Sequence, residues 1–155
     1  MITNVLEREE LERLLPHRGR MVLLSRIIRY DDLSLTAEYD ITAAGLFYDE
    51  ALGGFPAWAG FECMAQAIAA LGALSGQRDP RAPGCLLSVS AMTFAQPVLP
   101  CGSTVTVTVR EEGRSDRVSS FHGALFLAET PVAEGKLTVM EGTTGTEREQ
   151  NGGGQ

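Results

Sequence analysis

The chain has almost no lysine and carries more acidic than basic residues. It has 13 Lys and Arg residues together against 20 Asp and Glu residues, for a net charge of −7, and Lys136 is its only lysine. Nucleic-acid-binding proteins usually present a basic surface, so we expect no nucleic-acid partner. Because Lys136 is the only lysine, positive charge is presented almost wholly as guanidinium groups, which bind carboxylates and phosphates bidentately. The clusters Arg18/Arg20 and Arg78/Arg81 could receive an acidic partner, or they could be ordinary surface arginines.

Cysteine is scarce and does not occur in pairs. Cys63, Cys85 and Cys101 are odd in number and none belongs to a C-x-x-C motif, which argues against a disulfide framework and a zinc site. The N-terminal residues do not have the pattern of a signal peptide. We therefore expect reduced thiols in a cytoplasmic protein, and neither a metal nor a cofactor. Cys63 is interpreted as a small buried apolar residue rather than a nucleophile.

Charged side chains are nearly absent between Glu50 and Arg78, where Glu62 is the only one. Pro56 suits the first turn of a helix, and the residues after it are rich in Ala, Leu and Met, so we predict a helix to Leu74. A helix that is apolar almost all round is a buried helix. Its small residues and central Glu make it a poor membrane span, and we expect no membrane partner.

Glu62 is the first candidate for chemistry. A carboxylate in such a helix loses hydration, so its pKa should rise unless the fold supplies a partner. Buried carboxylates of this kind serve in general acid–base catalysis near neutral pH. The alternative is a structural Glu that hydrogen-bonds the backbone or lies at a subunit contact.

The remaining pattern predicts an α+β domain. We expect a short amphipathic helix, two strands, a loop, the long helix, a polar linker and four further strands, over residues 6–14, 21–30, 34–42, 43–54, 56–74, 77–83, 84–94, 103–110, 117–127 and 132–140. One antiparallel sheet of about six strands would curl around the long helix. The domain would span residues 1–141, and the Gly-rich residues 142–155 would be a disordered tail. Pairing of open sheet edges across a dimer would protect them.

Three segments of the chain resemble the hotdog-fold dehydratases that act on 3-hydroxyacyl-acyl carrier protein. They are Leu14-Leu-Pro-His-Arg-Gly-Arg-Met-Val-Leu-Leu-Ser-Arg-Ile27, Pro56-Ala-Trp-Ala-Gly-Phe-Glu-Cys-Met-Ala-Gln66 and Phe94-Ala-Gln-Pro-Val-Leu-Pro-Cys-Gly102. The order and spacing of the three are more specific than any one of them. The Pro56-Ala-Trp58 motif is most similar to that of the dehydratase-like subgroup found in aryl-polyene-type biosynthetic clusters.

This resemblance implies a hotdog fold and a dehydratase site at a dimer interface. In the family, a His takes the C2 proton and the helix carboxylate, here Glu62, helps the 3-hydroxyl leave as water. A backbone N–H at the helix N-terminus polarises the thioester carbonyl, because first-turn N–H groups lack partners and the helix dipole favours negative charge. Ala57, Trp58 and Gly60 would supply such donors.

The resemblance also implies an acyl thioester substrate, carried by acyl carrier protein or coenzyme A. Phe55, Trp58, Phe61 and Met64 could line a tunnel for the acyl chain along the apolar helix. For Phe61 and Met64, packing in the core is the simpler interpretation. The dimer could be a homodimer or a heterodimer with another hotdog subunit.

The chain departs from the family where the catalytic histidine should be. The segment before the helix has Gly54 at that position, and the chain contains only His17 and His122. His17 belongs to a segment that is structural in the family, and His122 falls in a predicted strand, where it would be a satisfied sheet residue. A polar residue of the loop before the helix could replace the base, although loop acids are usually only solvated; the candidates are Tyr48, Asp49 and Glu50.

Three functions remain open at this stage. The main hypothesis is a dehydratase that uses Glu62 as acid/base. The second is a non-catalytic or partner-dependent acyl-binding subunit, in which a partner's His could meet Glu62. The third is an acyl thioesterase, because hotdog folds also carry out hydrolysis with a helix carboxylate and a water. Fold alone does not separate them, since function resides in the site.

Overall fold

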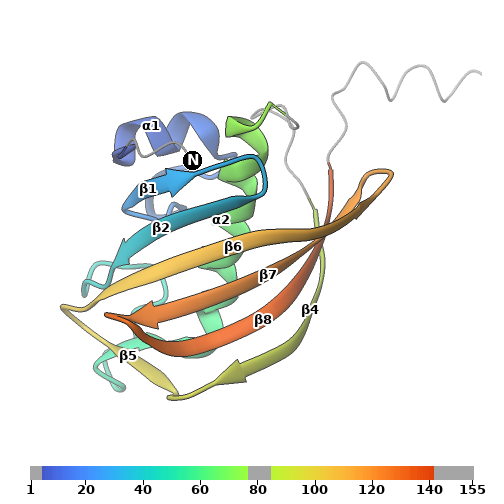
Figure 1. The fold of residues 1–155 in the computed structure, drawn as a ribbon. Coiled ribbons are helices and arrows are strands. Elements are labelled where there is room, and N and C mark those ends of the chain that lie inside the picture. Colours follow the sequence, from blue (N-terminus) through green and yellow to red (C-terminus); the bar gives the residue numbers. More distant parts are fainter. Residues whose placement is uncertain (1–4, 77–84, 142–155) are drawn as a thin grey trace, which may run out of the picture.

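A six-stranded antiparallel sheet curls around one long helix, α2 (Gly60–Leu74), in the computed structural model of this chain (Figure 1). The structure describes residues 5–76 and 85–141. The predicted tail at 142–155 and the Arg78/Arg81 cluster lie outside these residues, and the domain boundary at residue 141 stays a prediction. The predicted α+β arrangement of one curled sheet on one central helix is confirmed.

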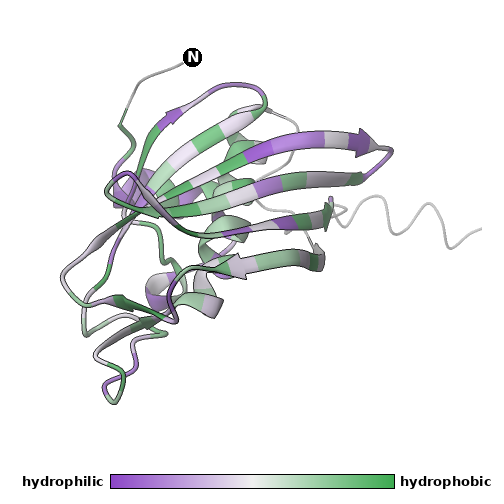
Figure 2. Ribbon diagram, turned by 60° about the horizontal axis from the view of Figure 1, so that its bottom comes forward, coloured by the Kyte–Doolittle hydropathy of each residue, from purple (hydrophilic) through white to green (hydrophobic). Residues whose placement is uncertain are grey.

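The large sheet has the strand order β1-β2-β6-β7-β8-β4, with antiparallel pairing throughout. Its strands are β1 (Arg26–Tyr30), β2 (Ser34–Asp40), β4 (Cys85–Phe94), β6 (Thr104–Ser115), β7 (Val118–Leu127) and β8 (Thr130–Met140). Alternate residues of a strand point to opposite faces, so one face packs on α2 and the other meets solvent. In β6, Val105, Val107 and Val109 are buried, and the bands of colour along the strands in Figure 2 follow this alternation.

The central helix is buried because its apolar residues cover most of its circumference. Cys63, Met64, Ala67 and Leu71 are all at most 2% exposed, and α2 contacts β2, β6, β7 and α1 (Arg8–Leu14). Residues Ala57–Leu74 have the length and hydropathy of a membrane span, but 56% of this stretch is buried inside the protein. Their apolarity is therefore that of a core helix.

The structure corrects two details of the expected element order. The predicted strand at 21–30 begins only at Arg26; before it the chain forms a short 3₁₀ turn, η1 (Gly19–Met21), and an extended segment. The predicted loop at 43–54 leads into β3 (Gly54–Pro56), which pairs with β5 (Val98–Pro100) in a separate two-stranded sheet. The 3₁₀ turn η2 (Ala57–Ala59) then joins β3 to α2. Strands of three residues with Pro and Gly give no periodic signal.

Candidate functional site

Glu62 lies in the first turn of α2 and is the only acidic residue there. Its side chain is 21% exposed, so the carboxylate is neither fully buried nor freely solvated. The fold supplies this carboxylate with two partners, both at Oε1, and these partners fix the direction in which it points.

The first partner of Glu62 is His17. The His17 Nε2 atom lies 3.1 Å from Glu62 Oε1, and the imidazole side chain is 24% exposed. The other ring nitrogen, Nδ1, is buried and has no hydrogen-bond partner among the described residues. Among the described residues, the ring of His17 therefore makes its polar contact through Nε2 alone. Sequence reasoning placed His17 as structural; the structure brings it to the candidate carboxylate.

Arg18 holds the backbone around His17 in place. Its guanidinium donates to the carbonyls of Glu12, Leu15 and His17, which closes the C-terminal end of α1 onto the segment that follows. The last carbonyls of a helix lack intrahelical donors, and an arginine side chain nearby can supply the missing hydrogen bonds. The guanidinium of Arg18 is thus occupied by these carbonyls, although Arg18 is exposed, as Arg20 is.

The second partner of Glu62 is Gln66, one helical turn further along α2. The fully buried Gln66 donates from Nε2 to Glu62 Oε1 at 3.3 Å and to the Met21 carbonyl. Its Oε1 accepts from the Leu23 N–H at 2.9 Å. Gln66 therefore joins the segment after His17 to the central helix. The sequence contained its signal, a lone amide four residues after Glu62 in an apolar helix, but gave it no role.

Gly54, where the family histidine is missing, has no room for a side chain in this structure. A Cβ at this position would lie 2.3 Å from the Leu99 carbonyl oxygen and 2.9 Å from Val98 Cγ1. Carbon atoms normally approach other heavy atoms no closer than about 3.5 Å. Because the obstacle is the backbone of β5, it cannot rotate away as a side chain would. The backbone at position 54 therefore has space for glycine and not for a histidine side chain.

Of the three predicted backbone donors, two already have acceptors. The Ala57 N–H donates to the Pro97 carbonyl at 2.9 Å, and the Gly60 N–H donates to the Ala57 carbonyl. The Trp58 N–H donates to none of the described residues. Trp58 is therefore the donor that we retain for a thioester carbonyl.

The three predicted acyl-binding aromatics lie at different depths. Phe55 is 1% exposed and packs edge-to-face on Tyr39, with ring centroids 5.2 Å apart. Phe61 is half-buried on the same side of α2 as Ala65. Trp58 is 58% exposed, a large apolar surface for one side chain, and its ring meets that of Phe47 edge-to-face at 6.3 Å. Their contribution to acyl binding stays a prediction.

None of the other candidate residues is a hydrogen-bond or ion-pair partner of Glu62 in the described part of the chain. His122 lies on β7 and its Nε2 faces Glu134 on β8 at 3.6 Å, on a solvent-exposed face. Asp49 accepts the Leu52 N–H and pairs with Gly54 through the backbone, which closes the turn before β3. Cys63 is 1% exposed, and burial raises the pKa of its thiol, as expected for a packing residue. Tyr48 is half-buried and Glu50 exposed.

Residues 9–150 match the family model described as ApeP-like, ApeP dehydratase. The chain belongs to the ApeP-like dehydratase family. The match includes the segment of His17 and the helix of Glu62, so the paired residues lie inside the part of the chain that defines the family.

Individual relatives agree with this assignment. The 3-hydroxyacyl-[acyl-carrier-protein] dehydratase FabZ of Chlamydia trachomatis is 29% identical over 143 residues, which cover 88% of this chain and 92% of the relative. The structure of the dehydratase heterocomplex ApeI:P from Xenorhabdus doucetiae superposes with a TM-score of 0.79 and 25% identity, and covers 93% of this chain and 97% of the matched one. The PaaI protein of Escherichia coli shares the fold at a TM-score of 0.61 and 15% identity, over 74% of this chain and 81% of its own. The protein is a dehydratase-like hotdog protein.

Proposed function

We propose that this ApeP-like protein eliminates water from 3-hydroxyacyl thioesters bound to acyl carrier protein. The family assignment supports a dehydratase, and the FabZ relative is named for this substrate class. The observation that carries the proposal is the carboxylate of Glu62, held by His17 and Gln66 in the first turn of the central helix. Elimination of water needs no net oxidation or reduction, so we propose no redox cofactor.

We assign the proton transfers to Glu62. One oxygen, Oε1, is fixed by His17 Nε2 and Gln66 Nε2, which leaves Oε2 to face the substrate. The carboxylate takes the C2 proton, the C2–C3 double bond forms as the C3–O bond breaks, and the same proton goes to the departing hydroxyl, which leaves as water. General acid–base catalysis by a positioned side chain contributes about 10²–10⁴-fold to the rate.

His17 acts in this scheme as a positioning residue. Its Nε2 lies 3.1 Å from Glu62 Oε1, within reach of a hydrogen bond that fixes the direction of the carboxylate. The second ring nitrogen, Nδ1, has no hydrogen-bond partner among the described residues, so His17 acts on Glu62 through Nε2.

The Trp58 amide and the exposed Trp58 ring complete the proposed site. A thioester oxygen near the N-terminal end of α2 would accept the unpaired N–H, where the helix dipole favours developing negative charge. The indole, together with Phe61, would offer apolar surface to the acyl chain. We further propose that the protein works in the cytoplasm, where its thiols stay reduced.

The test is turnover of a 3-hydroxyacyl-acyl carrier protein by the purified chain, followed by mass. We expect an enoyl product that is 18 Da lighter, and a loss of at least about a hundredfold in rate for Glu62→Gln. Glu134→Gln is the matched control, because it removes the same charge from an exposed carboxylate on the far face of the sheet. Release of free acid instead of an enoyl thioester would replace the proposal with the thioesterase function.

A second function is favoured by the backbone at Gly54. Since no side chain fits there, the chain cannot supply a histidine of its own at the family position. A partner subunit that carries this histidine would complete the site, and the ApeI:P structure is named as a heterocomplex. The edge strand β4 has only β8 as a neighbour among the described strands, and it exposes Val89 and Phe94. An open edge with apolar side chains is suited to pairing with another chain.

The same assay separates the two functions. Activity of the purified chain alone, lost in Glu62→Gln, supports catalysis by this chain. Activity that appears only after addition of a second hotdog dehydratase subunit supports the partner-dependent function. In that case the Glu62→Gln variant of this chain, mixed with the same partner, shows whether Glu62 or only the partner's residues carry out the elimination.

A further inference from the structure

The side-chain amide of Gln66 is fully buried and uses all of its hydrogen-bonding capacity. Its Oε1 accepts from the Leu23 N–H at 2.9 Å and from the Leu24 N–H at 3.4 Å. Its Nε2 donates to the Met21 carbonyl and to Glu62 Oε1, the latter at 3.3 Å. An amide has two N–H donors and an oxygen with two lone pairs, so these bonds occupy every position that it offers.

Only one orientation of the Gln66 amide satisfies the backbone around it. A backbone N–H can only donate, so the amide oxygen has to face Leu23, and a carbonyl can only accept, so the amide nitrogen has to face Met21. Exchange of the two atoms would place a donor against a donor and an acceptor against an acceptor. The second amide hydrogen is the one that reaches Glu62, so Gln66 meets this carboxylate as a donor and not as an acceptor.

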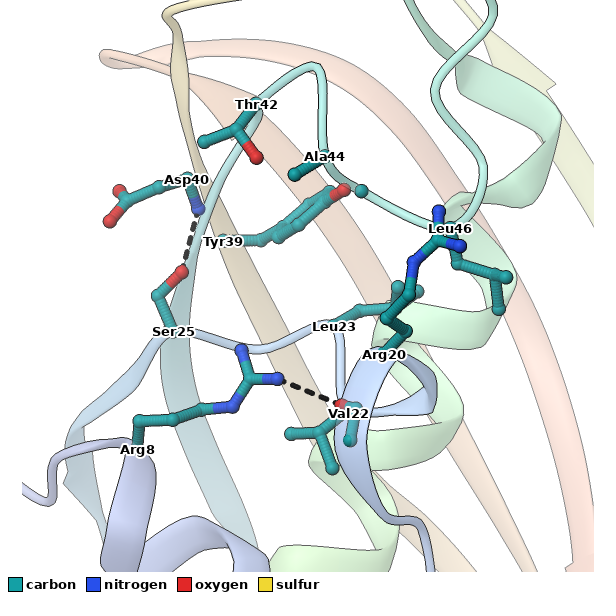
Figure 3. A pocket seen from close by; sticks show the side chains of 12 residues that line it. Arg8, Arg20, Val22, Leu23, Ser25, Tyr39, Asp40, Thr42, Ala44 and Leu46 are labelled. Carbon is teal, nitrogen blue, oxygen red and sulfur yellow. Dashed lines mark hydrogen bonds between the residues drawn. The ribbon is translucent and has the colours of Figure 1, made fainter.

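The backbone segment that imposes this orientation is held at both of its ends by other parts of the chain. At its start, the Arg8 guanidinium donates to the Gly19 carbonyl at 2.9 Å. At its end, the hydroxyl of Ser25 accepts the Asp40 N–H at 2.9 Å. Figure 3 shows both bonds around the pocket that this segment lines. Because neither bond involves Gln66, the segment fixes the Gln66 amide rather than the reverse.

We propose that Gln66 is a positioning residue that keeps Oε1 of Glu62 a hydrogen-bond acceptor, so that the proton moved in catalysis is carried on Oε2. A proton on Oε1 would face the Gln66 N–H and compete with it for the same oxygen. His17 Nε2 contacts this same oxygen at 3.1 Å, and Oε2 takes part in neither contact.

This inference rests on the proposed function, in which Glu62 transfers the proton. Oε2 takes the C2 proton, the C2–C3 double bond forms as the C3–O bond breaks, and Oε2 gives the same proton to the departing hydroxyl. Glu62 ends the cycle ionised, as it began it.

Gln66→Glu separates the positioning role from a purely structural one. A neutral glutamic acid at this position keeps the backbone bonds, because its carbonyl oxygen accepts from Leu23 and its hydroxyl donates to Met21. Burial and the nearby Glu62 carboxylate favour this neutral form. The variant therefore loses only the bond to Glu62. We expect a melting temperature close to that of the wild type, with kcat for enoyl formation lowered at least about tenfold and KM unchanged.

Gln96→Glu is the matched control for this variant. It makes the same chemical change in an amide that donates to the Val98 carbonyl and does not contact Glu62. We expect it to keep the wild-type kcat. The rates are measured on the purified chain, with a second hotdog dehydratase subunit added if the chain alone is inactive.

A spectroscopic measurement tests the same hydrogen bond without turnover. In ¹H–¹⁵N spectra, the side-chain NH₂ signals of Gln66 are assigned as those missing from Gln66→Glu. We expect Glu62→Gln to move the signal of one of the two amide protons, because that proton loses its charged acceptor. Glu134→Gln, which neutralises a distant exposed carboxylate, should move neither.

The outcomes distinguish this inference from the proposed function. A wild-type kcat in folded Gln66→Glu would show that Gln66 only joins the segment to α2, and would overturn the inference. Gln66 signals that Glu62→Gln leaves in place would overturn it as well, and this measurement decides alone if Gln66→Glu does not fold. A chain whose signals move as expected but that forms no enoyl product, alone or with a partner subunit, supports the hydrogen bond and contradicts only the proposed function.

Discussion

Replacement of Gly54 by alanine should destabilise the protein, because the new methyl group would overlap the backbone of β5. The added Cβ would lie 2.3 Å from the Leu99 carbonyl oxygen, more than an ångström inside normal contact. Overpacking of this kind costs about 1–3 kcal/mol. The alternative, separation of β3 from β5, would sacrifice backbone hydrogen bonds at about 0.5–1.5 kcal/mol each.

Urea unfolding measures this cost. With a slope of about 2 kcal/mol per molar urea, a loss of about 2 kcal/mol lowers the midpoint by about 1 M. Gly113→Ala is the matched control: Gly113 also lies in a strand, and its Cβ would meet nothing closer than 3.4 Å. A Gly54→Ala midpoint equal to that of Gly113→Ala would refute the reasoning. Because even a methyl group is excluded, Gly54→His should fail to increase the rate of dehydration.

Three further predictions concern residues around the site and the scaffold. Gln66→Leu should lower the free energy of unfolding by on the order of 3 kcal/mol, because the buried amide and carbonyl groups that it satisfies lose their partner; thermal melting checks this. The bond from Arg26 holds the pKa of Asp40 below its ordinary value. Ionised Asp40 therefore stabilises the fold at pH values above its unfolded pKa of about 4. This contribution is lost as pH falls through the lower folded pKa. The difference in urea midpoint between wild type and Asp40→Asn should therefore shrink below about pH 4, and a constant difference would contradict it. Iodoacetamide under native conditions should modify the exposed Cys101 and spare the buried Cys63, as read by peptide mass; rapid labelling of Cys63 would show that α2 opens.

The parts of the fold with a strong period could be predicted from the sequence, and the short segments could not. The alternation of Val105, Val107 and Val109 predicted a half-buried strand, and the apolar stretch around Glu62 predicted the central helix. The segment after His17 was predicted as strand because it is apolar. Instead, the Leu23 N–H and the Met21 carbonyl of this segment form hydrogen bonds with the side chain of Gln66. These bonds depend on a tertiary contact and not on the local sequence pattern.

Of the pair Glu62 and His17, only Glu62 could be predicted from the sequence as a site residue. Glu62 could be recognised because a single charge in an apolar helix is conspicuous. Its partner His17 could not, because nothing in the local sequence of either residue shows that α1 and the start of α2 bring them within 3.1 Å. The fit of Gly54 to glycine alone is likewise a property of the backbone of β5, which no motif records.

The most direct test of the account is a double-mutant cycle on Glu62 and His17, read as the single-turnover rate of enoyl formation from 3-hydroxyacyl-acyl carrier protein. If His17 acts by orienting Glu62, then His17→Gln slows the wild type but adds no further loss to Glu62→Gln, because residues that act as a unit are not additive. The account predicts a double variant as slow as Glu62→Gln alone. Additive losses, or a Glu62→Gln variant that keeps the wild-type rate, would contradict it.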